Sequence, residues 1–262
     1  MKVVKDHRNR KKMTFKVELI RSLYKIIDRF HLDAAVSDWA LTGTLKSSTK
    51  FFELDQLIDS HFKLHSEPAH ICRATLTEAL SRLEGRAATI IETGSSAWGT
   101  NSSLLFDAYV HSYGGTFETV DIRVAPSVVL QNRCSPSTRL YRDDSVSFLK
   151  KWSEANPNKK IDLLYLDSWD VNWQTPNPSA LHGLAELLAI FENLKEGTLL
   201  LVDDTPVDPS WFLSAQVQIA DFKKYQETYN FAPGKGALIK LLLTQLGRGK
   251  QIAHGYQLLW QF

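Results

Sequence analysis

The pattern of apolar and polar positions changes near residue 85. Before that point, apolar residues recur at helical spacing in three segments, residues 15–30, residues 52–62 and a stretch that begins at Thr75. Thr75 and Glu78 have the spacing of a capping box, which favours a helix start there. Residues 1–13 are charged and hold almost nothing apolar, so we expect them to be disordered. The pattern predicts a helical N-terminal extension over residues 1–85.

From residue 86 onward, short apolar runs alternate with stretches that suit helices. The runs are typical of buried strands and comprise Ala88–Glu92, Phe117–Asp121, Arg139–Arg142, Ile161–Asp167 and Thr198–Asp203. The helical stretches are Ser102–Ser112, Ser145–Ala155, Ala180–Leu194 and Gly234–Leu246. This alternation predicts an α/β domain over residues 86–262. We expect a Rossmann-like, doubly wound and mostly parallel sheet of seven strands, with helices on both faces.

Two segments of this domain are harder to assign. Residues 251–262 alternate loosely between apolar and polar positions, and we expect them to form a final strand. Residues 205–233 mix three prolines with polar and aromatic residues, and we expect an insertion or lid there. Because loops at the ends of strands set specificity, such an insertion would help to shape a binding pocket.

Composition fits a soluble globular protein. Hydrophobic residues make up 44% and charged residues 23% of the 262 residues, and no apolar run approaches the ~18 residues that a membrane span needs. The N-terminus is basic but lacks the apolar core of a secretory signal. Cys72 and Cys134 have no metal-ligand spacing, which favours free thiols in a reducing compartment. We therefore expect a cytoplasmic protein without a membrane span.

Charge is distributed unevenly along the chain. The formal net charge is only +2, yet residues 1–50 hold 12 Lys or Arg against 5 Asp or Glu. A basic arm of this kind suits nucleic acid or an anionic membrane surface, although a solvated arm is the simpler interpretation. The arm does not interleave aromatic residues with base-reading side chains, so nucleic acid is not the expected partner.

The clearest candidate for a cofactor site is the segment IIETGSSAWG, residues 90–99. An apolar run, an acid, a glycine turn and a helix start follow one another there, as in nucleotide-binding corners. The spacing Glu-x-Gly-x-x-x-x-Gly differs from the Gly-x-Gly-x-x-Gly fingerprint of dinucleotide enzymes. It favours S-adenosylmethionine, which has no pyrophosphate and whose methionine end needs backbone donors and an acid. The candidate residues are Glu92, Gly94, Ser95, Ser96, Gly99 and Ser102.

Acidic residues follow all five predicted strands. They are Glu92, Asp121, Asp143 with Asp144, Asp167, and Asp203 with Asp204. Ligands of open α/β sheets bind at the carboxyl ends of the strands, where these acids would gather. Such crowding of negative charge costs free energy unless a cation or hydrogen-bond donors lie among them.

Two of these strand ends have candidate roles toward an adenosyl group. Asp121 is placed to accept both ribose hydroxyls, or else to form an ordinary turn. Asp144 or Ser145 is placed to bond the adenine amino group. Either residue also suits the cap of the following helix, and the two roles are compatible.

The last two strand ends favour a metal site. Neighbouring strands lie ~5 Å apart, so Asp167, Asp203 and Asp204 can converge on one point. Three carboxylates suit Mg²⁺ rather than zinc. The alternative is a turn at Asp203 and Asp204 with Asp167 in solvent.

Two further features do not call for a functional role. We expect His182 to pack within its helix and Gly234-Lys235-Gly236 to form a flexible turn.

The ordered motifs IIETGSSAWG, ETVDI, RDDSVSFL, LLYLDSWD and LLLVDD resemble those of class I S-adenosylmethionine-dependent methyltransferases over residues 86–262. Within that class the chain is similar to the Mg²⁺-dependent O-methyltransferases of the catechol and macrocin types. The resemblance implies Mg²⁺ at Asp167, Asp203 and Asp204. It also implies an acceptor with a hydroxyl group, such as a sugar, a phenol or another natural product. A homo-oligomer is a separate hypothesis that the sequence leaves open.

The resemblance leaves the catalytic base open. Relatives often place Lys or His near the position of Asp170. A carboxylate with a reference pKa of ~3.9 deprotonates a hydroxyl only if a metal lowers the pKa of that hydroxyl or burial raises its own. We therefore expect Asp167 and Asp170 to be the catalytic residues, with Asp170 as the base or as a group that positions the acceptor.

Two alternatives remain on the same residues. One is an enzyme similar to cephalosporin hydroxylase, which has related motifs. The other is a non-catalytic adenosyl-binding or protein-binding module. Metal-dependent methylation of an acceptor with added S-adenosylmethionine would exclude the first. If the chain is a binding module, changes of Asp167 or Asp203 would leave ligand binding and biological activity intact.

Overall fold

The computed structural model describes residues 50–96, 99–212 and 216–262. The predicted helix at residues 15–30, the disordered start and most of the basic arm lie outside the described residues. Within the described part of the chain, the helices are too short or too polar to cross a membrane.

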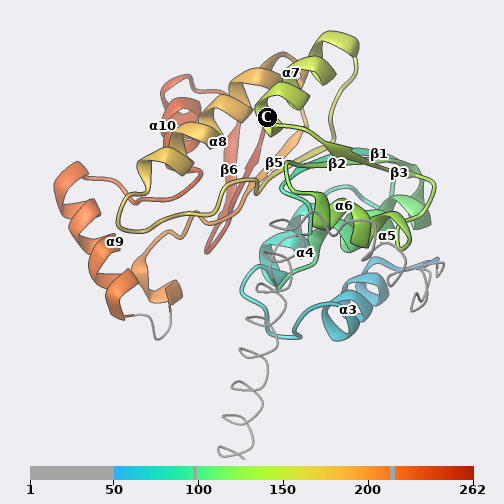
Figure 1. Ribbon diagram of the computed structural model, residues 1–262, viewed down its shortest axis with the longest axis horizontal. Helices are drawn as coiled ribbons and strands as arrows, with labels where there is room; N and C mark the ends of the chain where they lie inside the picture. Colours follow the sequence, from blue (N-terminus) through green and yellow to red (C-terminus); the bar gives the residue numbers. More distant parts are fainter. Residues whose placement is uncertain (1–49, 97–98, 213–215) are drawn as a thin grey trace, which may run out of the picture.

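The centre of the fold is a seven-stranded sheet in the order β3-β2-β1-β4-β5-β7-β6 (Figure 1). The strands are β1 (Ala88–Thr93), β2 (Gly115–Asp121), β3 (Thr138–Arg142), β4 (Leu163–Leu166), β5 (Leu199–Val202), β6 (Lys250–His254) and β7 (Leu258–Gln261). Strands β1 to β5 pair parallel with one another, whereas β7 pairs antiparallel with both β5 and β6. The expected α/β fold with a mostly parallel seven-stranded sheet is confirmed. The order reverses between β1 and β4, the point at which open sheets bind ligands.

Helices cover both faces of the sheet. They are α3 (Leu54–Leu64), α4 (Arg73–Ser81), α5 (Ser102–Tyr113), α6 (Val124–Gln131), α7 (Ser145–Ala155), α8 (Asn177–Ile190), α9 (Gln216–Tyr229) and α10 (Ala237–Gln245), with 3-10 turns η1 (Phe191–Asn193) and η2 (Pro209–Phe212). Helices α3, α4 and α5 form one hydrophobic core with the sheet, and α7, α8 and α10 form another on the opposite face. Helix α9 extends to one side of the molecule (Figure 1).

Strands β4 and β5 are apolar at every position because both of their faces are buried. In β4, Leu163 and Tyr165 belong to the core under α4 and α5, whereas Leu164 and Leu166 belong to the core under α7 and α8. Alternate residues of a strand point to opposite faces, so a sheet covered on both sides requires a continuous apolar run. This requirement explains why the strands were predictable from the sequence.

The expected single strand over residues 251–262 is wrong. The segment forms the hairpin of β6 and β7, with Gly255, Tyr256 and Gln257 between the two strands. The apolar pattern did not distinguish two strands, because only β7 is buried, at Leu258, Leu259 and Trp260. Strand β6 lies at the edge of the sheet.

Three other elements differ from the prediction. Helix α4 begins at Arg73, and Thr75 is buried within it, so the expected capping box is absent. Helix α6 was not predicted, because it spans only eight residues and contains a proline. The expected lid at residues 205–233 holds η2 and α9 among its described residues.

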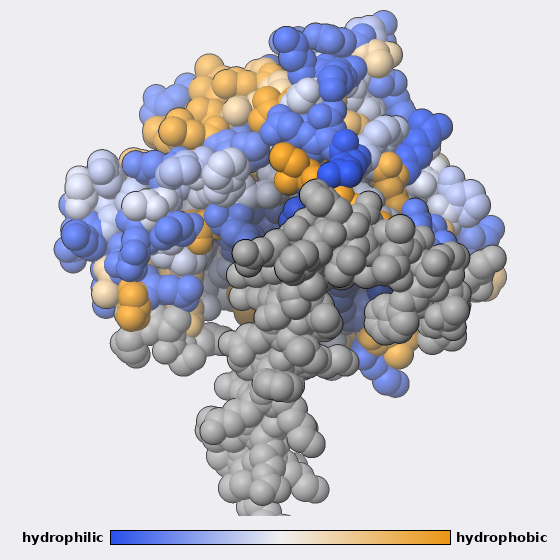
Figure 2. Space-filling view, viewed as in Figure 1, coloured by the Kyte–Doolittle hydropathy of each residue, from blue (hydrophilic) through white to orange (hydrophobic). Residues whose placement is uncertain are grey.

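An exposed apolar face lies over α8 and α10. Leu181 and Leu188 of α8, with Leu241 of α10 and the adjoining Leu246, are about half exposed. Figure 2 shows apolar surface gathered over the region of these helices. The face lies on the side of the sheet opposite α3 and α4.

Candidate functional site

A cavity of about 350 Å³ opens at the carboxyl ends of the strands. It is lined by the turns after β1, β2, β4 and β5, by the segment between α3 and α4, and by Tyr256 of the β6–β7 hairpin. Eight residues predicted from the sequence line it together, namely Gly94, Ser95, Ser96, Asp121, Asp167, Asp170, Asp203 and Asp204. The volume lies in the range of small-molecule sites.

The turn after β1 requires glycine. Gly94 has a φ of +81°, and a Cβ at this position would lie 2.2 Å from the backbone oxygen of Asp167. The turn therefore passes directly against the end of β4. Any residue with a side chain would clash with the Asp167 backbone here, so only glycine allows this approach.

Glu92 is fully buried and turned away from solvent. Its carboxylate accepts hydrogen bonds from the hydroxyls of Ser102 at 2.5 Å, of Thr119 at 2.7 Å and of Ser103. Burial raises the pKa of Glu92 to about 7, although the three hydroxyls oppose the shift. Glu92 and Ser102 thus hold the start of α5 against β1 and β2. Gly99 lies beside His70, where a Cβ would meet Nε2 at 2.9 Å.

Asp121 ends β2 with its carboxylate at the cavity. It accepts hydrogen bonds from the backbone N–H groups of Ser95 at 3.1 Å and Arg123 at 2.7 Å. The Arg123 guanidinium also donates to both carboxylate oxygens, at 3.0 and 2.7 Å. The Arg123 side chain is 40% exposed, whereas the Asp121 side chain is only 4% exposed.

A smaller adjoining pocket contains Asp144, Ser145, Trp169 and His182. Asp144 caps α7 by accepting from the backbone N–H of Ser147 at 2.9 Å, as expected for a cap. The imidazole Nε2 of His182 lies 3.0 Å from the hydroxyl of Ser145. His182 therefore lines a pocket, whereas the sequence favoured simple packing.

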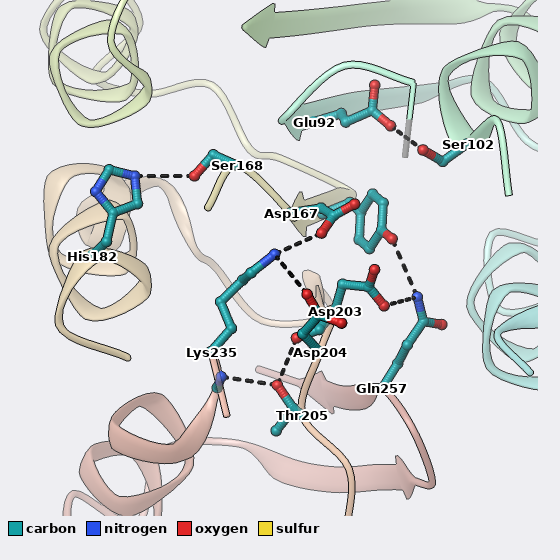
Figure 3. Close-up of polar contacts among 12 residues, drawn as sticks. Glu92, Ser102, Asp167, Ser168, His182, Asp203, Asp204, Thr205, Lys235 and Gln257 are labelled. Atoms are coloured by element: carbon teal, nitrogen blue, oxygen red, sulfur yellow. Dashed lines mark hydrogen bonds and ion pairs between the residues drawn. The ribbon is translucent and has the colours of Figure 1, made fainter. Parts of the chain in front are cut away.

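His182 belongs to a buried polar network. Its Nε2 also lies 3.0 Å from the Ser168 hydroxyl, which donates to the Glu186 carboxylate at 2.7 Å. Glu186 is fully buried, and the interaction of its carboxylate with the His182 imidazole raises the pKa of His182. Ser168 directly follows Asp167, so this network fixes the turn after β4 from the α8 side (Figure 3).

Asp167, Asp203 and Asp204 form an acidic cluster. One oxygen of each carboxylate lies within 4.8 Å of the others. Asp203 accepts from the Gln257 amide at 2.8 Å, and Asp204 accepts from the Tyr256 hydroxyl. Burial raises the pKa of Asp204 to about 6, with a further contribution from Asp203. The predicted convergence of the three carboxylates is therefore present.

Lys235 is a residue of the site that the sequence did not predict. Its side chain is fully buried, and its ammonium lies 2.6 Å from Asp167 Oδ1 and 3.8 Å from Asp204 Oδ2 (Figure 3). Although burial lowers the pKa of Lys235, the surrounding carboxylates outweigh that effect and raise it. The expected flexible turn at Gly234-Lys235-Gly236 is wrong. Glycines on both sides of a lysine were the available signal.

Two further residues of the cavity come from the segment between α3 and α4. His70 and Cys72 line it, and the Cys72 thiol lies 3.7 Å from Asp203 Oδ1. Burial raises the pKa of the Cys72 thiol and lowers that of His70. Sequence reasoning missed both, because no local motif links this segment to the strand ends.

No family model and no curated protein matches the sequence. Among solved structures, the chain is similar to the MycE methyltransferase from the mycinamycin biosynthetic pathway in complex with Mg and SAH, with a TM-score of 0.53 and 16% identity. The same values hold for MycE in complex with Mg, SAH and mycinamycin VI. Each alignment covers 82% of this chain and 55% of the MycE chain, so this chain spans about half the length of MycE.

A more distant match is the O-methyltransferase from Bacillus cereus in complex with SAH, with a TM-score of 0.43 and 13% identity over 87% of this chain and 97% of that one. The likeness to MycE confirms the fold expected from the sequence. The described part of the chain therefore shares the α/β fold of MycE.

Proposed function

We propose that this protein is an S-adenosylmethionine-dependent methyltransferase that methylates a hydroxyl group of a small molecule or sugar. One observation carries the proposal: a single cavity holds the Gly94 turn, the Asp121 carboxylate and the acidic cluster of Asp167, Asp203 and Asp204. The fold supports it, because MycE was solved with SAH, the product left by S-adenosylmethionine.

The adenosyl group would lie between the turns after β1 and β2. The Gly94, Ser95 and Ser96 turn would face the methionine end, and Asp121 would take the ribose hydroxyls in place of Arg123. The adenine would enter the adjoining pocket, beside Asp144 and Ser145. Glu92, Ser102 and Gly99 would support this arrangement from behind.

The acidic cluster fits a divalent cation. Three carboxylates offer the oxygen ligands that Mg²⁺ prefers, and with Lys235 they carry a formal charge of −2 that one divalent ion would balance. A bound Mg²⁺ would lower the pKa of an acceptor hydroxyl and orient it. MycE, which was solved with Mg, supports this assignment.

Asp170 is the candidate base of the reaction. It is exposed and lines the same cavity as the acidic cluster, which supports a role in taking the proton of the acceptor hydroxyl. The acceptor oxygen would attack the sulfonium methyl, and the methyl–sulfur bond would break as the new C–O bond forms. Holding the reactants at attack distance is the main task of such a site.

The wider context is proposed on the same grounds. The acceptor is a sugar, a phenol or another natural product, and MycE was solved with mycinamycin VI. The free thiols of Cys72 and Cys134 support a cytoplasmic location. The exposed leucines of α8 and α10 support a homo-oligomer.

The proposal is tested by methyl transfer from labelled S-adenosylmethionine to a panel of hydroxyl acceptors. We expect transfer with MgCl₂ and its loss in excess EDTA, because the acidic cluster would lose its cation. Full activity in excess chelator would remove the metal from the proposal. Oxidation of an acceptor without methylation would favour the cephalosporin hydroxylase-like alternative.

A further inference from the structure

The backbone around Lys235 is shaped to bring this residue into the interior. Lys235 N–H donates to the Asp204 carbonyl at 3.0 Å, and the next N–H donates to the Thr205 hydroxyl at 2.8 Å. A Cβ at Gly234 would lie 2.6 Å from the Asp204 oxygen, and one at Gly236 would lie 2.8 Å from Thr205 Oγ1. Only glycine on both sides lets the lysine approach the turn after β5 this closely.

Helix α8 makes room for the same segment. Gly183 lies in this helix, and a Cβ there would come within 2.8 Å of the Lys235 carbonyl oxygen. Three glycines from two separate elements therefore surround one lysine. This arrangement is a built site for a buried ammonium rather than a loop that happens to carry a charge.

Lys235 reaches the acidic cluster from the protein side. The carboxylates of Asp167, Asp203 and Asp204 line the cavity, but Lys235 is fully buried and is absent from its lining. Figure 3 shows Lys235 on one side of the cluster and Gln257 on the other. The lysine is therefore placed to hold the carboxylates without meeting the acceptor.

We infer that Lys235 is a positioning residue, a permanent counter-ion that keeps the acidic cluster assembled before a divalent cation enters. Three carboxylates within 4.8 Å repel one another strongly in a buried site. The ammonium at 2.6 Å from Asp167 offsets one of the three charges. The same charge repels an incoming cation, so the lysine also weakens cation binding.

This inference rests on the proposed function only for its statement about cation binding. The counter-ion role itself concerns the protein without metal, and it is measurable in EDTA. The counter-ion role and the effect on cation binding can therefore be tested separately with one set of variants.

The test compares thermal unfolding of wild type, Lys235→Met, Asp167→Asn and the double variant in EDTA. Lys235→Met leaves the carboxylates unopposed, and we expect the melting temperature to fall by about 10 °C. The double variant restores the net charge of the cluster and should recover at least half of that loss. A double variant no more stable than Lys235→Met would overturn the inference, even if the single variant does not fold.

Cation binding gives the second readout. We expect Lys235→Met to bind Mg²⁺ at least about tenfold more tightly than wild type in calorimetry, because the repelling charge is gone. Lys240→Met is the matched control, since Lys240 lies on α10 and contacts His254 instead of the cluster. Unchanged or weaker Mg²⁺ affinity in Lys235→Met would contradict the repulsion. No Mg²⁺ binding by any variant, with recovery in EDTA, would count against the proposed metal alone and support the counter-ion role.

Discussion

Individual side chains at the strand ends divide into two groups, those that face the cavity and those that build its walls. Asp121 and the acidic cluster face the cavity, whereas Glu92 is enclosed by the hydroxyls of Ser102, Ser103 and Thr119. All of them follow a strand in the same way in the sequence. They differ because α5 begins close to the end of β1 and supplies the hydroxyls of Ser102 and Ser103 to Glu92.

Glu92 makes the stability of the protein depend on pH. Its pKa in the folded protein is about 7, above the reference value of 4.5, so the native state binds more protons than the unfolded state between these pH values. Stability therefore falls as pH rises from 4.5 to 7. Glu92→Gln removes this titration. Between pH 4.5 and 7, the free energy of unfolding of this variant should therefore change by about 3 kcal/mol less than that of wild type.

Urea unfolding of wild type and Glu92→Gln at several pH values measures this difference. The difference in the free energy of unfolding between the two proteins should change steadily between pH 4.5 and 7. A constant difference across this range would show that Glu92 stays ionised in the folded protein.

The acids at the strand ends were predictable because each one directly follows an apolar run. Lys235 was not, because its partners Asp167 and Asp204 lie 68 and 31 positions away along the chain. Local pattern cannot report a contact of that range. The same reason explains why His70 and Cys72 were missed.

At the scale of elements, the five parallel strands were predictable and the C-terminal hairpin was not. Strands β1, β2, β4 and β5 lie inside the sheet and contribute to the buried cores, which leaves apolar runs in the sequence, whereas β3 is an edge strand whose residues are only partly buried or exposed. Strand β6 lies at the sheet edge and lacks that signal. The hairpin matters for the site because its turn supplies Tyr256 and Gln257 to the acidic cluster.

The start of α7 offers a test of two roles for one residue. Asp144 caps this helix through Ser147, so Asp144→Ala should lower the free energy of unfolding by about 1 kcal/mol. Asp144→Asn keeps a side-chain acceptor and should retain wild-type stability. The neighbouring Asp143→Ala serves as control, because Asp143 pairs with Lys151 at the surface.

Urea unfolding measures the capping effect, and calorimetry with S-adenosylhomocysteine measures the adenine contact. Equal destabilisation by Asp144→Ala and Asp144→Asn would rule out the cap as the source of the effect. A loss of ligand affinity in Asp144→Asn at normal stability would assign the carboxylate to the adenine amino group.

At the scale of the whole molecule, the described part of the N-terminal extension shares its core with the sheet. Phe62, Leu76 and Leu80 of α3 and α4 belong to the same buried cluster as Ile90 and Leu259 of the sheet. The boundary at residue 85, which the change of pattern predicts, therefore separates two kinds of element that fold around one core. This shared core also carries His70 and Cys72 to the cavity.

Leu80→Ala tests whether these parts unfold together. Leu80 is fully buried, so its truncation should cost about 2–5 kcal/mol in the free energy of unfolding, comparable to Leu163→Ala in β4. Ser81→Ala is a neighbouring control at an exposed position. Unfolding followed by two probes should show one transition for Leu80→Ala and one for Leu163→Ala. An early separate transition in Leu80→Ala would mean that α3 and α4 form an independent unit.

The central claim is that the carboxyl edge of this sheet binds an adenosyl ligand, and titration calorimetry with S-adenosylhomocysteine tests it most directly. We predict one site per chain in wild type and at least about 30-fold weaker binding in Asp121→Ala, which would lose the two proposed charge-assisted contacts to the ribose. Asp162→Ala, at the opposite edge of the sheet, should bind like wild type. Absence of binding to wild type, or equal affinity in Asp121→Ala, would contradict the account.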